Sequence, residues 1–216
     1  MRYHVPVAHT VLGFLLVVLL AGSTAAGFEQ ALDLRSIDDA IAIGQSSIEA
    51  VRTRYHQPYR IQVARPPIDY IEIVTPFRRV VLLAEERVQL GARLFQREAI
   101  AALGNRSGVV EVLVGMTFHP LNAFVGVPEY DVELVTASPV ARISPRNISR
   151  VPRFSSPVPV RRFGSPVPNG GEPLVGGTIA ASFGAAALNP NGVYDVVVSE
   201  KGKELARARV SLGNLR

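Results

Sequence analysis

A change in hydrophobic period at Gly108 is the sequence feature that most restricts the fold of this chain. Before Gly108, apolar residues of two long segments recur at steps of three and four, the spacing of one helix face. After Gly108, apolar and polar residues mostly alternate, which is typical of strands with one face buried. We therefore expect an α+β fold, with an N-terminal helical region that includes a short β element, followed by a β-rich half.

The first helix is expected over residues 36–55. Ser36 and Asp39 have the spacing of a capping box, in which each side chain satisfies a free backbone N–H of the other. The helix should end near Tyr55, because Pro58 cannot continue it. One apolar stripe runs along the predicted helix, at Ile37, Ile41, Gly44, Ile48 and Val51.

A second helix is expected over residues 76–103. Thr75 is a good N-cap, and Pro76 suits the first helical turn, where its missing N–H costs nothing. Gly91 is the weakest point of this helix and allows two readings, one continuous helix or two shorter ones. The run 79–83 also fits a strand, so that alternative stays open.

Strands are expected on both sides of the second helix. Two short ones, at 59–63 and 69–74, flank the Pro66-Pro67 break. After Gly108 the alternating pattern predicts five more, at 109–118, 130–135, 175–183, 193–199 and 204–212. Lys201-Gly202 is expected to form the hairpin turn between the last two strands.

The segment Leu188-Asn189-Pro190-Asn191-Gly192-Val193-Tyr194-Asp195-Val196-Val197-Val198 resembles the tyrosine corner of fibronectin type III and immunoglobulin-like sandwiches. In those domains the tyrosine begins the penultimate strand, and its hydroxyl bonds to the backbone of the preceding loop. The resemblance implies that Tyr194 plays this role in an immunoglobulin-like antiparallel β-sandwich. It departs from the family in lacking the buried tryptophan, since the chain contains no Trp.

The N-terminal 26 residues resemble a targeting sequence. An apolar run from Val11 to Leu20 is followed by small residues, and cleavage near Ala25 or Ala26 would suit signal peptidase. The run is shorter than the roughly 20 residues of a membrane-spanning helix, so an uncleaved anchor is the weaker alternative. An exported chain without Cys points to a bacterial protein, secreted or periplasmic. We expect a signal peptide at 1–26, a helical region at 27–105 and the sandwich at 106–216.

Residues 139–175 stand apart in composition. They contain eight of the 16 prolines, and six arginines against one acidic residue, Glu172. Pro cannot donate to a β-ladder, so edge strands or extended polyproline pieces are expected here. Arginines interleaved with aromatic residues suit contact with an anionic or partner surface. An Arg-rich loop over the sandwich edge is the alternative. The candidate contact residues are Arg146, Arg150, Arg153, Arg161, Arg162 and Phe163.

The sequence contains no assembled catalytic, cofactor or metal motif. The lack of Cys excludes disulfides, thiolate metal sites and cysteine nucleophiles, and no phosphate-binding or nucleophile-elbow motif is present. His56 and His119 do not lie in a ligand-spaced cluster. Asp131 and Glu133 share one face of a predicted strand, which suits either a solvated face or a pair of catalytic carboxylates.

These observations favour an exported, non-catalytic protein that works through a protein or cell-surface partner, without a cofactor, nucleic acid or stable membrane insertion. Two alternatives remain open. One is a hydrolase that uses carboxylates such as Asp131 and Glu133. The other is a module that binds anions or polysaccharides through its Arg-rich loop.

Overall fold

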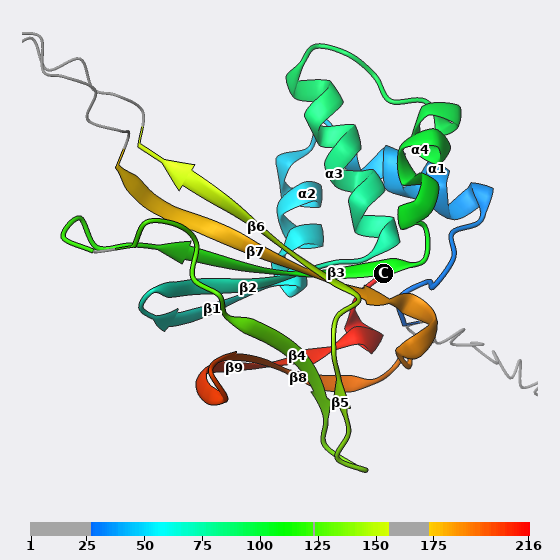
Figure 1. The fold of residues 1–216 in the computed structure, drawn as a ribbon. Helices are drawn as coiled ribbons and strands as arrows, with labels where there is room; N and C mark the ends of the chain where they lie inside the picture. The colour runs from blue at the N-terminus through cyan, green and yellow to red at the C-terminus, as the bar shows by residue number, and fades with distance from the viewer. Residues whose placement is uncertain (1–26, 123, 156–172) are drawn as a thin grey trace, which may run out of the picture.

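The computed structural model describes residues 27–122, 124–155 and 173–216, and it has a mixed α+β fold with two antiparallel sheets (Figure 1). The predicted signal peptide, and three of the candidate contact residues (Arg161, Arg162 and Phe163), lie outside the described residues. Within these ranges, the structure contains no helix that is long and apolar enough to span a membrane.

Four helices replace the two that the periodicity predicts: α1 (Leu34–Gly44), α2 (Glu49–His56), α3 (Pro76–Gln89) and α4 (Gln96–Leu103). The capping-box prediction is wrong in detail, because Asp33 is the N-cap of α1 and accepts a hydrogen bond from the Ser36 N–H at 2.7 Å. Thr75 caps α3 and Pro76 begins it, as predicted. Gly91 has a φ of +71°, and the chain leaves the helix there, so the reading with two shorter helices is confirmed.

Helices α1, α3 and α4 pack on one another around a core of their own (Figure 1). Gly44 lets α1 approach α3 closely, because a Cβ at this position would lie 2.4 Å from the Val81 oxygen. The buried residues of this helical core are Ile37, Ala40, Phe77, Val80, Val81, Ala84, Leu94, Ala99 and Leu103.

The first sheet, sheet A, has the strand order β1-β2-β3-β7-β6. Strands β1 (Arg60–Arg65) and β2 (Ile68–Val74) precede α3, whereas β3 (Val109–Thr117), β6 (Asn147–Phe154) and β7 (Leu174–Gly184) follow the helices. Strand β2 pairs with β3 from Ile68–Met116 to Val74–Glu111. Strands from both sides of the boundary expected at residue 105 therefore belong to one continuous sheet.

The second sheet, sheet B, has the order β5-β4-β8-β9. It contains β4 (Asp131–Thr136), β5 (Arg142–Ile143), β8 (Val193–Glu200) and β9 (Lys203–Ser211). Strands β4, β8 and β9 lie within one residue of their predicted ranges, whereas no range was predicted for β5. Lys201 and Gly202 make the predicted hairpin turn, both with positive φ.

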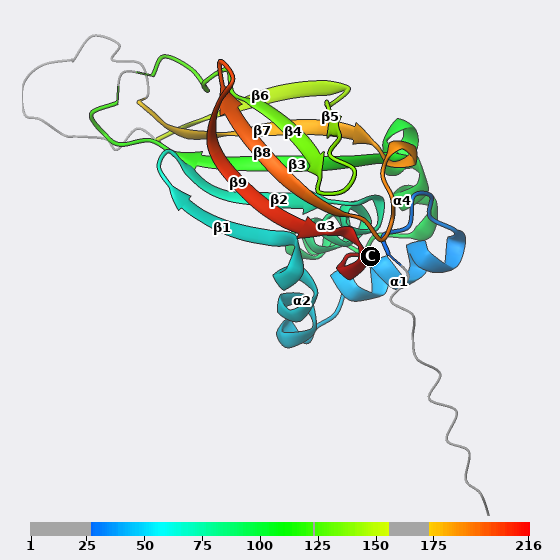
Figure 2. The same ribbon diagram turned by 90° about the horizontal axis from the view of Figure 1, so that it is seen from below.

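The main core lies between the two sheets, which cross face to face (Figure 2). Alternate residues of each strand point into it, such as Val110, Val112 and Val114 of β3 in sheet A. Sheet B contributes Val132 and Val196, both fully buried. Burying one such valine contributes about 1.5–3 kcal/mol relative to leaving it exposed, so this alternation holds the sheets together.

The Pro-rich segment provides edge strands, as predicted. Among the described residues, β6 pairs only with β7, and β5 pairs only with β4, through two residue pairs. Pro152 lies within β6, where a residue without an N–H is tolerated because the strand has an open side.

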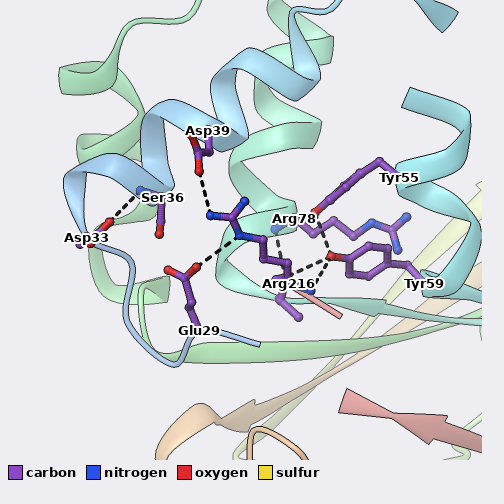
Figure 3. Close-up of polar contacts among 9 residues, drawn as sticks. Glu29, Asp33, Ser36, Asp39, Tyr55, Tyr59, Arg78 and Arg216 are labelled. Carbon is purple, nitrogen blue, oxygen red and sulfur yellow. Dashed lines mark hydrogen bonds and ion pairs between the residues drawn. The ribbon is translucent and has the colours of Figure 1, made fainter. Parts of the chain in front are cut away.

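A polar network around Arg216 connects the helices to the sheets (Figure 3). The Tyr59 hydroxyl accepts a hydrogen bond from the Arg216 N–H at 3.0 Å and donates one to its main-chain oxygen at 2.9 Å. The same oxygen accepts a bond from the Thr75 hydroxyl at 2.6 Å. The Arg216 guanidinium lies 2.8 Å from Asp39 on α1 and stacks over the Phe77 ring of α3. The network therefore joins α1 and α3 to Tyr59, directly before β1, and to Arg216, which follows the last strand of sheet B.

Candidate functional site

The three candidate arginines of the Pro-rich segment that the structure describes lie on or beside edge strand β6. Arg150 donates to the main-chain oxygens of Pro128 and Tyr130, each at 3.2 Å, and so ties β6 to the start of β4. Arg153 donates to the Met116 oxygen at 3.2 Å and to the Thr117 hydroxyl at 2.9 Å. These two side chains hold strands together within the protein. An anion-binding role for the Arg-rich segment stays a prediction.

Arg153 and Arg146 reach their positions because glycines lie opposite them on β7. A Cβ at Gly176 would lie 2.6 Å from the Arg153 guanidinium, and one at Gly184 would lie 2.2 Å from that of Arg146. Both arginines therefore lie flat against the sheet.

The carboxylates Asp131 and Glu133 line a surface hollow of about 500 Å³, together with Glu204 of the neighbouring part of sheet B. Glu133 pairs with Arg142 at 2.8 Å, and Glu204 pairs with Arg207 at 2.6 Å. The Arg207 hydrogen bond holds the pKa of Glu204 below its usual value, so this carboxylate stays ionised. Asp131, the third carboxylate of the hollow, has no ion pair within the described residues.

No group of three or more His, Cys, Asp or Glu side chains among the described residues is arranged to hold a metal ion.

The end of sheet A that lies away from α1 and α4 (Figure 1) carries exposed apolar residues, on the segment that follows β3 and at the last residue of β6. We call it the loop end and define it by Leu121, Phe124, Val125 and Phe154. Leu121 is 87% exposed and Val125 is fully exposed, whereas Phe124 and Phe154 are 41% and 48% exposed. Isolated exposed apolar residues are ordinary, but four at one end of a sheet make it a candidate interaction surface.

The loop end is held in place by contacts to β7. The Phe118 N–H donates to the Val175 oxygen at 3.0 Å, and the Phe118 ring packs on Phe124 with ring centres 4.7 Å apart. The Asn122 amide reaches the Leu174 oxygen at 3.4 Å, and Leu174 is the ladder partner of Phe154. The loop that carries Leu121 and Phe124 is thus held against β7 by hydrogen bonds and by the packing of Phe118.

Polar residues also gather in a groove between α2 and α3, beside the β1–β2 hairpin, and sequence reasoning missed this cluster. His56, at the end of α2, lies 2.8 Å from Glu85 of α3. Glu72 of β2 is bound by Arg78 of α3 and Arg60 of β1. No motif could have revealed the groove, because its residues come from four different elements and have no common spacing in the sequence.

The chain matches no protein-family model, and it has no significant match among curated proteins or solved structures.

Proposed function

We propose that the protein is an exported, non-catalytic protein that binds a protein or cell-surface partner through its loop end. The observation that carries this proposal is the exposure of Leu121, Phe124, Val125 and Phe154 at one braced end of sheet A. Covering a large apolar side chain is worth about 1.5–3 kcal/mol before the costs of association, so a partner that covers this surface gains binding energy.

Export by cleavage is compatible with the contacts of residues 27 and 28. The Gly27 N–H donates to the Asn191 side chain at 3.1 Å, and Phe28 is buried. A Cβ at Gly27 would lie 2.0 Å from the Pro190 oxygen, so the chain is tightly packed from this residue onward. Cleavage near Ala25 or Ala26 would leave these contacts intact. N-terminal sequencing of the protein recovered from the periplasm or medium should begin at residue 26 or 27; an unprocessed Met1 would contradict export by cleavage.

The binding proposal is tested by removing the apolar character of the loop end. In the double variant L121S/V125S, binding of the purified mature chain to isolated cell envelopes should fall at least tenfold. V140S is the matched control, because Val140 is 77% exposed in the turn between β4 and β5. Equal binding by wild type and L121S/V125S in co-sedimentation would overturn the proposal.

The anion-binding alternative rests on Arg161 and Arg162, since Arg150 and Arg153 already bond within the protein. It predicts binding to anionic polysaccharide that weakens with salt. Unchanged binding in R161A/R162A would remove it.

A second candidate function, a carboxylate-dependent hydrolase, draws on the hollow lined by Asp131 and Glu133. A panel of chromogenic esters, glycosides and phosphoesters separates it from the binding proposal. Turnover by the wild type that Asp131→Asn abolishes would contradict a non-catalytic function.

We also propose that the two sheets form an immunoglobulin-like sandwich. The proposal is supported by the Tyr194 hydroxyl, which accepts a hydrogen bond from the Asn189 N–H at 2.7 Å, as in a tyrosine corner. Losing this acceptor in Tyr194→Phe should lower the free energy of unfolding by about 1–3 kcal/mol. Unchanged stability of the variant in urea would count against the corner.

A further inference from the structure

Strand β9 is the longest open sheet edge in the described part of the chain. It has nine residues, contains neither Pro nor Gly, and pairs only with β8 among the described residues. The other three edge strands are less suited to a further partner, because β5 has two residues, β6 contains Pro152, and β1 has a register shift between Gln62 and Arg65. The unpaired backbone N–H and C=O groups of a long edge are a template for another strand.

A groove of about 540 Å³ lies between β9 and β1, the edge strand of sheet A. The two strands approach each other at one end and diverge toward their hairpin turns (Figure 2). Ile61 and Val63 of β1 and Ala208 of β9 line this space, and all three also pack in or against the main core. We call it the β1–β9 groove. A strand placed in it meets apolar side chains and the open edge of β9 together.

The polar part of the β1–β9 groove carries more positive than negative charge. Arg207 and Arg209 project from β9 and share Asp195 of β8, at 3.2 and 2.9 Å. Arg207 also pairs with Glu204 at 2.6 Å. Arg65 of β1 lines the groove and has no ion pair within the described residues. Three arginines against two carboxylates leave one positive charge, so the groove favours an acidic partner over a basic one.

We propose that the β1–β9 groove binds an extended acidic segment of a partner protein, which pairs with β9 as an added strand. In this mode of recognition, main-chain hydrogen bonds give affinity and alternate side chains give specificity. Because side chains of a strand alternate between its two faces, apolar residues of the segment face Ile61 and Val63, and acidic residues lie on the face of Arg207 and Arg209. The partner segment therefore alternates apolar and acidic residues. This surface is separate from the loop end and does not rest on the proposed function.

The probe is a capped synthetic peptide as long as β9, in which Val and Glu alternate. In an NMR titration of the mature wild-type chain, amide signals of β9 and β1 should shift with saturation, and backbone N–H groups on the open side of β9 should exchange more slowly with solvent. A peptide in which Lys replaces Glu should bind about tenfold more weakly or worse, because its charges face the arginines. The proposal is overturned if the Val–Glu peptide does not saturate or if both peptides bind equally.

Variants place the peptide in the groove. The double variant R65Q/R209Q should weaken binding of the Val–Glu peptide about tenfold. Arg142→Gln is the matched control and should leave binding unchanged, because Arg142 is 67% exposed and pairs with Glu133, much as Arg209 is 70% exposed and pairs with Asp195. Equal affinity of R65Q/R209Q and R142Q would show that the peptide binds elsewhere and would overturn the proposal.

Two further measurements separate this surface from other possibilities. The loop-end variant L121S/V125S should bind the Val–Glu peptide as the wild type does, so failure of the loop-end proposal is distinct from failure of this one. Sedimentation of the free chain should show a monomer. A dimer whose interface maps to β9 by NMR would make a second copy the occupant of the groove, and it too would overturn the proposal.

Discussion

Tyr59 lies in the core with 1% of its surface exposed, and its hydroxyl bonds to both main-chain polar groups of Arg216 (Figure 3). The Tyr55 hydroxyl lies 3.0 Å away, and the guanidinium of Arg78 stacks over the Tyr59 ring. One side chain thus joins the start of β1 to the end of the described chain. A buried hydroxyl that both donates and accepts a hydrogen bond within the protein should contribute to stability and not to binding.

Replacing Tyr59 by Phe tests this role, since the ring is kept and only the hydroxyl is lost. We expect the free energy of unfolding to fall by about 1–3 kcal/mol, because the Arg216 N–H loses its acceptor. Urea titration followed by circular dichroism measures the change. Tyr70→Phe is the control, as its hydroxyl has no hydrogen bond within the described residues. Equal losses in both variants would contradict a specific role of the Tyr59 hydroxyl.

Burial also raises the pKa of both Tyr55 and Tyr59 above the ordinary value. The folded state therefore keeps these tyrosines neutral, whereas an unfolded chain ionises them near pH 10. The contribution of these two neutral tyrosines to the free energy of unfolding is fully present below about pH 10. Above it, the free energy of unfolding should fall by up to about 1.4 kcal/mol per pH unit for each tyrosine. Thermal melts from pH 8 to 11 measure this decline, and a smaller slope is expected for Y59F. A flat profile would contradict the burial of these hydroxyls.

Among the helices, the contact between α1 and α3 depends on one glycine. A Cβ at Gly44 would lie 2.4 Å from the Val81 oxygen and 2.6 Å from the Ala84 methyl, so a side chain here would push α3 away. Backbone at this distance cannot move aside as the tip of a side chain can. The first apolar stripe therefore ends in a close approach between helices, and the chain turns away after Gly44 to form α2 separately.

We expect Gly44→Ala to lower the free energy of unfolding by about 1–3 kcal/mol, because the added methyl forces α1 away from α3. Gly108→Ala is the matched control, since a Cβ at Gly108 meets nothing within 4 Å. Urea denaturation of the two variants measures the difference. If G44A is as stable as G108A, the helices are not in the close contact described here.

At the scale of the whole molecule, helices and sheets are joined through sheet A. Strand β2 lies between β1 and β3 and pairs with β3 through six of its seven residues. It leads directly into α3 through Thr75, and Arg216 adds the bonds that close this junction. The two halves expected from the sequence therefore share a sheet and a polar network.

A fragment of residues 106–216 tests this coupling. Without β1 and β2 the fragment exposes Val112 and Val114, which are otherwise fully buried. We expect it to remain unfolded or to aggregate, whereas residues 27–216 should unfold in one cooperative transition. A well-dispersed NMR spectrum of the isolated fragment would instead support the division into domains at residue 105.

Much of the secondary structure was predictable because its signals are local. Thr75 and Pro76 mark a helix start, because the Thr side chain accepts a bond from a free backbone N–H and Pro suits the first turn. The alternation along 109–117 follows from a strand with one buried face. The prolines of residues 139–175 predicted edge strands, and the two described strands of that segment, β5 and β6, lie at sheet edges. By contrast, the N-cap of α1 is Asp33 and not Ser36, and residue spacing alone does not distinguish between these two nearby residues.

The candidate sites were less predictable, because they depend on neighbours in space. Arg150 and Arg153 suggested an anion-binding surface in the sequence, but nearby carbonyl groups bind both of them. The exposure of Leu121 and Val125 depends on the fold of the loop that carries them. The groove between α2 and α3 is lined by His56, Glu72 and Glu85, which come from three different elements.

The sequence by itself determined the α+β class, the approximate bounds of seven strands, the start of α3, and the edge positions of β5 and β6. These properties follow from backbone constraints and hydrophobic period, which act within a few residues. Only the tertiary structure decided that β1 and β2 join the sheet of β3, and which charged side chains are paired. Strand partners and ion pairs are set by the packing of distant segments, and no local pattern encodes that packing.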